Sequence, residues 1–136
     1  MDIETSMLIS AAGLRAQSLR MRVISENLAN ASSIASNPDV DPYRRKIVSF
    51  KNMMDQELGV SLVKVDKVDY DKKPFGTKYD PGHPAADEKG YIKESNVQSM
   101  IETMDMQQAQ RTYQANLNAI SASRNMLMQT VELLKG

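Results

Sequence analysis

The sequence has no cysteine and no tryptophan, it has one histidine, and its 17 basic residues are balanced by 17 acidic ones. Without cysteine the chain has no disulfide, no thiolate nucleophile and no cysteine-ligated zinc. A formal net charge of zero gives no overall field that would hold nucleic acid or an anionic membrane surface. These absences exclude thiol and disulfide chemistry and do not favour a nucleic-acid or membrane-surface partner.

Long hydrophobic runs are also absent. No apolar stretch approaches the roughly 20 residues that a membrane-spanning helix needs. The N-terminus carries Asp2 and Glu4 where a secretory signal carries basic residues. We therefore expect no cleaved signal peptide, and export from the cytoplasm would need a specialised route. At 136 residues the chain has the size of one ordinary domain.

Charged residues are concentrated in the middle of the chain. Residues 1–35 hold six of them, residues 36–96 hold 22 and residues 97–136 hold six. A globular domain with polar, frayed tails would show the reverse distribution. We therefore expect the charge-poor ends to be covered by partners.

The N-terminal segment, residues 2–33, has the pattern of a helix with a broad apolar face. It contains no proline, and two adjacent stripes of apolar residues recur at helical spacing: Met7, Leu14, Met21, Ile24, Leu28 and Ala31, and Leu8, Ala12, Leu19 and Val23. This face is wider than a two-position coiled-coil seam, so it has room for more than one neighbouring helix. Gly13 within it either permits close backbone approach or is a tolerated weak point that costs about 1 kcal/mol relative to alanine.

A second and more regular helical pattern covers residues 96–135. Its apolar row, with members seven apart and two more interleaved, consists of Met106, Tyr113, Ile120, Leu127 and Leu134 with Leu117 and Val131. Such a helix would span roughly 58 Å, which is too long for burial by one equal partner within a small domain. We expect other chains to cover the remaining surface. Ser95 and Gln98 are expected to cap its start as a capping box.

The middle segment, residues 36–95, has loop and β-strand character. It opens with Pro38 and Pro42 among Asx residues, which break helices and build turns. Residues 43–50, 60–70 and 91–93 have strand-like composition. Tight turns are expected at residues 79–84, with Pro81 as the first central residue, and at residues 88–90. The sequence thus predicts a mainly α protein with a small β-containing middle.

Candidate catalytic residues are few. His83 lies between a glycine and a proline and has no helical partner at the spacing of metal motifs, so we expect a role in a turn. Glu102 and Asp105 share a helix face, as an acid and base pair would, but are expected to be solvated. The sequence predicts no enzyme, no cofactor and no small-molecule substrate.

Clusters of like charge also give little indication of a binding site. Asp66, Asp69 and Asp71 alternate with lysines, which would neutralise a cation site, so we expect a solvated strand and no metal. The basic residues 44–46 are too few for a nucleic-acid-binding face. They are expected to make polar contacts within an assembly.

Several segments resemble proteins of the flagellar rod and hook family. Residues 10–17 and 23–31 resemble the N-terminal signature of that family, whose most specific part here is Asn27, Leu28, Ala29 and Asn30. The resemblance extends over nearly the whole chain through residues 43–46, which include Tyr43 and Arg44, and residues 79–84, 90–92, 96–97, 102–106 and 111–116. These segments are similar to the members that form the proximal rod.

The resemblance implies a structural subunit of the flagellar basal body. Residues 1–35 and 96–136 would pair as one discontinuous, coiled-coil-like inner domain lining an export channel, and residues 36–95 would form the loop and β-rich middle segment. The chain would leave the cytoplasm through the flagellar type III export apparatus without cleavage. In the periplasm it would join copies of itself, other rod proteins and membrane-ring or export-gate components into a torque-transmitting helical tube.

The apolar rows supply the residues expected to pack between subunits: Leu14, Met21, Ile24, Leu28, Met106, Tyr113, Leu117, Ile120, Leu127 and Val131. The same apolar faces would also suit a soluble helical adaptor or secretion chaperone that binds one partner. Solution size separates the two, because a chaperone forms a defined small complex whereas a rod subunit stays monomeric until templated. An enzyme of cell-wall remodelling is a third and more distant alternative.

Overall fold

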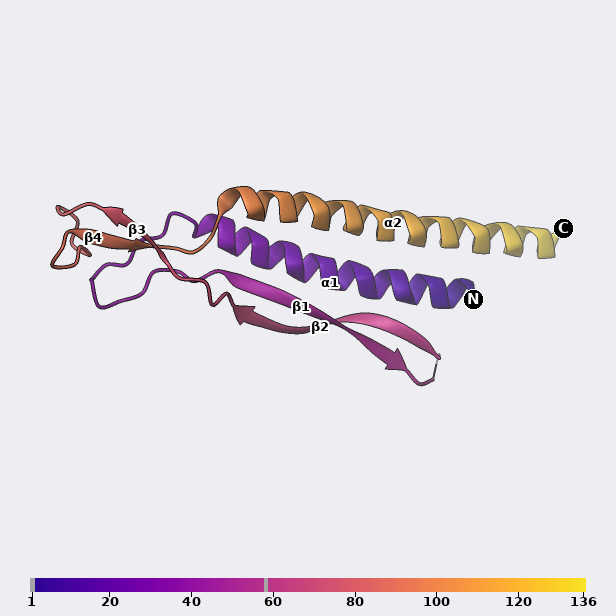
Figure 1. Cartoon of the computed structure of the whole chain (residues 1–136). Helices are drawn as coiled ribbons and strands as arrows, with labels where there is room; N and C mark the ends of the chain where they lie inside the picture. Colours follow the sequence, from indigo (N-terminus) through magenta and orange to yellow (C-terminus); the bar gives the residue numbers. More distant parts are fainter. Residues whose placement is uncertain (1, 58) are drawn as a thin grey trace. The chain divides into compact units, whose positions relative to one another are not determined.

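The computed structural model describes residues 2–57 and 59–136. Met1 and Leu58, which fall in the predicted inner domain and middle segment, lie outside the described residues. The elements in chain order are α1 (Ile3–Ala29), β1 (Lys46–Asp55), β2 (Val60–Tyr70), β3 (Gly76–Tyr79), β4 (Tyr91–Glu94) and α2 (Ser99–Lys135) (Figure 1). The predicted order of helix, small β-containing middle and long helix is confirmed.

Helix α1 ends four residues earlier than the sequence pattern indicates. The backbone N–H of Asn30 still donates to the Glu26 carbonyl oxygen at 3.1 Å, and the Asn30 side-chain amide donates to the same oxygen at 2.8 Å. An asparagine that bonds the last carbonyl groups competes with further helix and favours a turn. A turn follows, in which the N–H of Ser33 donates to the carbonyl oxygen of Asn30 at 3.0 Å.

Helix α2 begins at Ser99, and the predicted capping box is wrong. The buried Ser95 hydroxyl accepts a hydrogen bond from the N–H of Val97, at 3.3 Å, and Val97 precedes the first residue of the helix. The N–H of Glu102 donates to the carbonyl oxygen of Gln98 at 3.1 Å, which closes the first helical turn. With 37 residues, α2 has a length of roughly 55 Å at 1.5 Å per residue.

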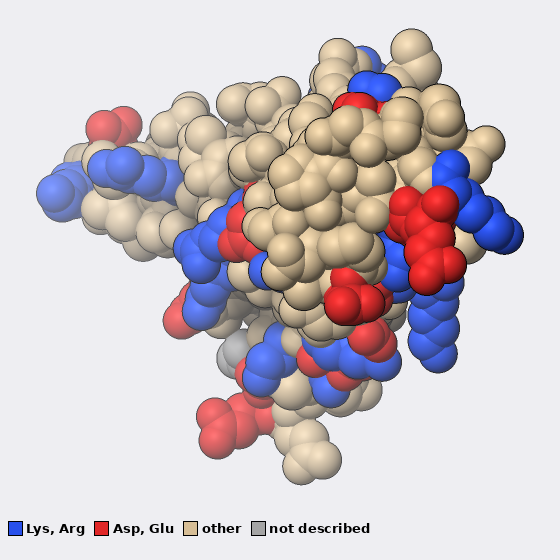
Figure 2. Space-filling view, turned by 90° about the vertical axis from the view of Figure 1, so that its left-hand side faces the viewer, with Lys and Arg blue, Asp and Glu red and all other residues tan. Residues whose placement is uncertain are grey.

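The middle segment holds two separate two-stranded sheets, β1 with β2 and β3 with β4. Strands β3 and β4 are antiparallel, with Gly76 opposite Glu94 and Tyr79 opposite Tyr91. The expected turn at Pro81 is confirmed, because the His83 N–H donates to the Asp80 carbonyl oxygen at 3.2 Å. Basic and acidic side chains are interspersed over the face drawn in Figure 2.

The second expected turn depends on a glycine. Gly90 has a φ of 84°, a conformation that side chains other than glycine rarely adopt, and its N–H donates to the Asp87 carbonyl oxygen at 2.9 Å. A Cβ atom at this position would also lie 2.9 Å from the Tyr79 ring. The turn thus places β4 beside β3, where Tyr79 and Tyr91 make an edge-to-face contact with ring centroids 5.2 Å apart.

The chain divides into two compact units, each built from both helices and part of the middle segment. Unit 1 comprises Met1–Met21, Ser49–Lys67 and Gln107–Gly136, and its described residues start at Asp2. Within unit 1, Ser6 and Ser123 hydroxyl oxygens lie 3.5 Å apart and Arg20 donates to Gln108 at 3.4 Å. These contacts show that the α1 and α2 segments of unit 1 run antiparallel beside each other (Figure 1).

Gly13 lies at a close contact between these two segments. A Cβ atom built on Gly13 would lie 2.8 Å from Nδ2 of Asn116, which is shorter than any normal contact. Of the two explanations that the sequence left open, close packing is therefore the one supported here, with the Asn116 side chain against the Gly13 backbone. The low helix propensity of glycine is the cost of having it at this contact.

Unit 2 comprises Arg22–Val48 and Val68–Met106. Its buried apolar residues are Val23, Ile24, Ala85, Ile92 and Val97, and Asn27, Asp71 and Glu102 are buried with them. Ser95 is buried as well, so four buried polar side chains lie beside this small apolar core, and each needs hydrogen-bond partners to be tolerated. In the part of the chain that the structure describes, no helix has the length and apolar character needed to cross a membrane.

Candidate functional site

The family-motif residue Asn27 is the centre of a buried polar cluster in unit 2. Its side-chain amide donates hydrogen bonds to the Lys46 carbonyl oxygen at 2.9 Å and to the Glu102 carboxylate at 3.0 Å. Its side-chain oxygen accepts from the Tyr43 hydroxyl and the Lys46 backbone N–H, each at 2.9 Å. All four hydrogen-bonding positions of the amide are thus occupied. This explains why an asparagine only 1% exposed is tolerated.

Glu102, in the first turn of α2, is 0% exposed, so the expectation that it is solvated is wrong. Its two carboxylate oxygens accept hydrogen bonds from Nε of Arg45 and from Nδ2 of Asn27. Asp105 is only half-buried, but it too is paired, with 3.4 Å between its carboxylate and Nη2 of Arg45. Both acids belong to an ion-pair network inside the chain and not to a wet helix surface.

Arg45 holds three carboxylates at once. Besides Glu102 and Asp105, it contacts Asp71 with 3.3 Å between Nη1 and Oδ2. Burial by itself lowers the pKa of Arg45, but the hydrogen bond and charge of Glu102, followed by those of Asp71, raise it above its ordinary value. Removing one partner of such a buried pair leaves an uncompensated charge and typically costs 3–5 kcal/mol.

The backbone N–H and carbonyl groups of Arg45 are also hydrogen-bonded. Its N–H donates to the Asn96 side-chain oxygen at 2.7 Å, and its carbonyl oxygen accepts from the Asp71 N–H at 2.8 Å. The Asn96 amide in turn donates to the carbonyl oxygens of Asp71 and Lys73 at 3.2 and 3.1 Å. We call the set Asn27, Tyr43, Arg45, Asp71, Asn96 and Glu102 the polar junction.

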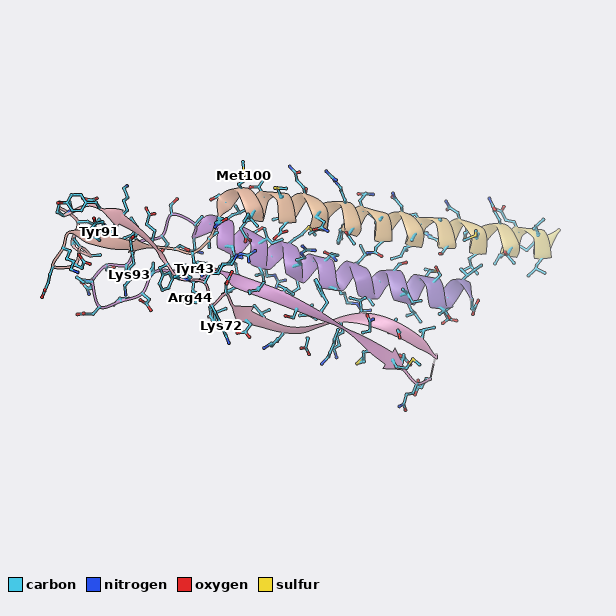
Figure 3. The ribbon with its side chains drawn as sticks, viewed as in Figure 1. Tyr43, Arg44, Lys72, Tyr91, Lys93 and Met100 are labelled. Atoms are coloured by element: carbon cyan, nitrogen blue, oxygen red, sulfur yellow. The ribbon has the colours of Figure 1, made fainter. Side chains whose placement is uncertain are left out.

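Arg44 reinforces the polar junction from outside. Its Nη1 donates to the carbonyl oxygens of Asp71 and Lys73 at 2.8 and 3.0 Å, and its guanidinium carbon lies 4.1 Å from the centroid of the Phe75 ring. Figure 3 shows Tyr43, Arg44 and Lys72 near one another where the chain enters β1. The segments before β1 and after β2 are therefore tied together by side chains as well as by strand pairing.

The basic residues 44–46 thus make their contacts within this chain, whereas the sequence-based expectation placed such contacts within an assembly. Lys46 completes the set, with 2.8 Å between Nζ and the Glu26 carboxylate. That hydrogen bond raises the pKa of Lys46. Burial raises the pKa of Tyr43, whose hydroxyl bonds Asn27. At neutral pH Lys46 therefore stays protonated and charged, and Tyr43 stays protonated and neutral. Lys46 remains the cation of its ion pair, and the Tyr43 hydroxyl remains a hydrogen-bond donor.

Acid is expected to weaken the polar junction through Asp71. A hydrogen bond from the Lys73 N–H, aided by the Arg45 guanidinium, holds the pKa of Asp71 below its ordinary 3.8 in spite of burial. Because the folded pKa is the lower one, the stabilisation is fully present above about pH 5 and is lost as the pH falls through the folded value. Urea unfolding followed by circular dichroism should show a larger loss of stability from pH 7 to pH 3 for the wild type than for Asp71→Asn. Equal losses would contradict this role of Asp71.

The polar junction fastens four segments of unit 2 to one another. It joins the end of α1, the start of β1, the segment after β2 and the start of α2 within unit 2. The hydrogen-bonding groups of Asn27 and Glu102 are directed at one another and at other groups of the chain. Among residues 2–57 and 59–136, no group of three or more potential ligands is placed to hold a metal ion.

The residues predicted to pack between subunits differ in exposure. Ile24 is buried, and six others are half-buried: Leu14, Met21, Leu28, Met106, Tyr113 and Ile120. Leu117, Leu127 and Val131 are exposed. Of the family motif, Asn27 is buried, Leu28 and Asn30 are half-buried and Ala29 is exposed. Packing between subunits stays a prediction for all of them, and it applies best to the three exposed residues of α2.

Sequence reasoning missed Arg45, Asp71, Asn96 and Glu102 as members of a site. The available signal was helical position: Glu102 lies four residues before Met106 and seven before the buried Ala109, on the inner face of α2. Asn27 similarly follows the buried Val23 and Ile24 at helical spacing. Asp71 and Asn96 carry no comparable pattern. His83 was predicted correctly as a turn residue, since its Nδ1 accepts from the Ala85 N–H at 3.0 Å.

Comparisons with known proteins place these features in a family. Residues 88–133 match the family model described as flagellar basal body rod FlgEFG protein C-terminal. Proteins named flagellar basal-body rod protein FlgC are similar along almost the whole chain. The protein from Agrobacterium fabrum is 47% identical over 93% of this chain and 91% of its own length. The Bacillus subtilis protein is 36% identical over 96% and 97%, and the Borreliella burgdorferi protein is 35% identical over 100% of both chains. The chain therefore belongs to the FlgC family of flagellar basal-body rod proteins.

Proposed function

We propose that this chain, as a structural subunit of the flagellar basal-body rod, works by packing its two helices against neighbouring subunits in a helical tube that transmits torque. The observation that carries this proposal is the large apolar surface that α2 leaves uncovered: Leu117, Met126, Leu127, Met128, Val131, Leu133 and Leu134. Full burial of one such side chain contributes about 1.5–3 kcal/mol. A helical assembly repeats that gain at every subunit, and interdigitated side chains resist shear because they are close-packed.

Residues 1–35 and 96–136 act together as a coiled-coil-like inner domain in this proposal, and residues 36–95 brace neighbouring subunits. Contacts in unit 1 support the pairing: Ser6 and Gly13, seven residues apart on α1, face Ser123 and Asn116, seven apart on α2. A seven-residue spacing on both helices is the repeat of coiled-coil packing. Glycine at position 13 leaves room for the Asn116 side chain against the α1 backbone.

The chain occupies the proximal part of the rod, crosses the periplasm and reaches it through the flagellar type III export apparatus without cleavage. Its direct partners are copies of itself, other rod proteins and membrane-ring or export-gate components. The names of the relatives support a place in the rod. A role as an adaptor or chaperone is not favoured by the comparisons.

Two experiments test the proposal: deletion of the chain, and purification of basal bodies from cells that carry a tagged copy. A strain without the chain should be non-motile and lack hooks and filaments, and an internally tagged copy should restore swimming. The tagged chain should then be recovered in purified basal bodies. If it is instead found as a small soluble complex while the rod assembles normally without it, the proposed function is wrong.

We expect the isolated chain to be less helical than α1 and α2 together, which have 27 and 37 residues. The last third of α2 has no covering element, because every described residue from 124 to 135 is exposed. Helix propensity alone stabilises such a segment poorly in water. Hydrogen exchange of the monomer should be fast in residues 124–135 and slow around Glu102, with a correspondingly low helix signal in circular dichroism. Full helix with uniform protection would contradict the proposal that neighbours cover α2.

A further inference from the structure

The contact between Gly13 of α1 and Asn116 of α2 in unit 1 depends on the shapes of both residues. A Cβ atom built on Gly13 would lie 2.8, 2.9 and 3.0 Å from Nδ2, Oδ1 and Cγ of Asn116. Because the three distances are nearly equal, the flat face of the amide lies against the place that a Cβ would occupy. A hydrogen bond from Nδ2 to the Thr112 carbonyl oxygen, at 3.0 Å, holds the amide to its own helix. Asn116 in this position therefore fits opposite a residue that has no Cβ.

Gly13 is the only glycine of α1, and α2 contains none. In the observed antiparallel register, Ser6 lies opposite Ser123 and Gly13 lies opposite Asn116. A slip of seven residues, which is one coiled-coil repeat, would place Asn116 opposite Ser6 or Arg20. Both of these have a Cβ, and so does every other residue of α1. Only the observed register therefore leaves room for the amide.

The other contacts of this helix pair discriminate less between registers. The hydrogen bond of 3.5 Å between the Ser6 and Ser123 hydroxyls is long, and the contact of Arg20 with Gln108 joins two long side chains at an exposed site. Small side chains fit opposite one another in more than one register. The buried residues of the two helix segments in unit 1 are all small: Ser10, Ala16, Ala109 and Ser123.

We propose that Gly13 and Asn116 fix the register in which α1 and α2 pair, and that this register is required for assembly. We call the two residues the register pair. An asparagine at a single core position is known to specify register in coiled coils. In this chain the register decides how far α2 extends past the start of α1, and so where the exposed Leu127 and Val131 lie beside it. The requirement for assembly rests on the proposed function, whereas the register is a property of the single chain.

Disulfide trapping in the purified chain measures the register, and the absence of natural cysteine keeps the background clean. Ser6→Cys with Ser123→Cys reports the observed register. Ser6→Cys with Thr130→Cys reports a slip of seven residues, because position 130 is one repeat, or roughly 10.5 Å, further along α2 and out of reach in the observed register. Ser6→Cys with Met128→Cys is the matched control. Met128 lies close to Thr130 but on another face of α2, so this pair reports general loosening of the helices.

Without a change in the register pair, the observed-register cysteines should oxidise about tenfold faster than the slip cysteines. Asn116→Ala should raise oxidation of the slip cysteines several-fold and leave the Met128 control unchanged, because it removes the discrimination but not the pairing. Exchanging the two residues, Gly13→Asn with Asn116→Gly, keeps the composition and should restore the preference for the observed register. Gly13→Asn alone should abolish it.

Two results would overturn the role of the register pair: slow oxidation of the slip cysteines in Asn116→Ala, or an equal rise in the slip and control pairs. If Gly13→Asn does not fold, Asn116→Ala still decides, since alanine favours helix and fits opposite glycine. Intact swimming of a chain shown to slip would overturn the requirement for assembly alone. Wild-type chain missing from purified basal bodies would overturn the proposed function and leave the disulfide result unaffected.

Discussion

Cells carrying Leu117→Asp are expected to be non-motile, without hooks or filaments, while the variant chain itself is made and exported. Leu117 is 40% exposed in the chain alone, so an aspartate there meets water and should leave the subunit folded. After assembly the same position is proposed to be buried against a neighbour. Burying an ionised carboxylate without a partner costs several kcal/mol. The substitution also removes the about 1.5–3 kcal/mol that burial of the leucine contributes to assembly. Every subunit would carry that penalty.

Fractionation checks this expectation, because the variant should be found free and not in purified basal bodies. Leu117→Met is the matched control, since it keeps an apolar side chain of similar volume and should swim. Circular dichroism of the purified variant should equal that of the wild type. Recovery of Leu117→Asp in intact basal bodies at wild-type amounts would show that this face of α2 is not buried between subunits.

Glu102→Ala is expected to destabilise the subunit itself. The substitution leaves Arg45 without its most buried carboxylate and Asn27 with an unpaired donor, and both remain inside unit 2. The loss should be about 3–5 kcal/mol, the usual range for breaking a buried pair. Small proteins are stable by about 5–15 kcal/mol in total, so the chain should be degraded in cells and swimming should be lost.

Urea unfolding and the cellular level of the chain measure this effect. Glu102→Gln should fall between alanine and the wild type, because the amide keeps the shape and one acceptor but loses the charge. Glu88→Ala, at an exposed position in the turn before β4, is the control and should change stability by less than about 0.5 kcal/mol. A Glu102→Ala chain as stable as this control would show that the ion pairs of Arg45 contribute little.

The helices and strands could be predicted because their signals are local. Apolar spacing defined α1 and α2, alternation defined β2, and the dipeptide Pro81-Gly82 together with Gly90 defined the turns around β4. Helix boundaries were less certain, because they depend on single hydrogen bonds. The side chains of Asn30 and Ser95 bond nearby backbone groups, and they decide where α1 ends and that α2 starts later than expected.

The polar junction could not be predicted, because its members converge from four segments far apart in the sequence. Arg45 and Glu102 are 57 positions apart, and Asn27 and Glu102 are 75. A charged residue in a charge-poor helix is usually solvated, and only its place on the inner face of α2 indicated burial. Family resemblance pointed to Asn27, Tyr43 and Arg44, but not to what they contact. The structure supplies the reason that an asparagine stands at that position in this chain.

The central claim is that neighbouring subunits cover the exposed face of α2. A helical reconstruction of the basal body at side-chain resolution tests this claim most directly. We expect α1 and α2 of this chain to lie in the wall of the rod, with Leu117, Leu127 and Val131 within about 4.5 Å of side chains from neighbouring subunits. The contrary result would be a chain outside the rod wall, or a chain within it whose three residues face solvent or the open channel.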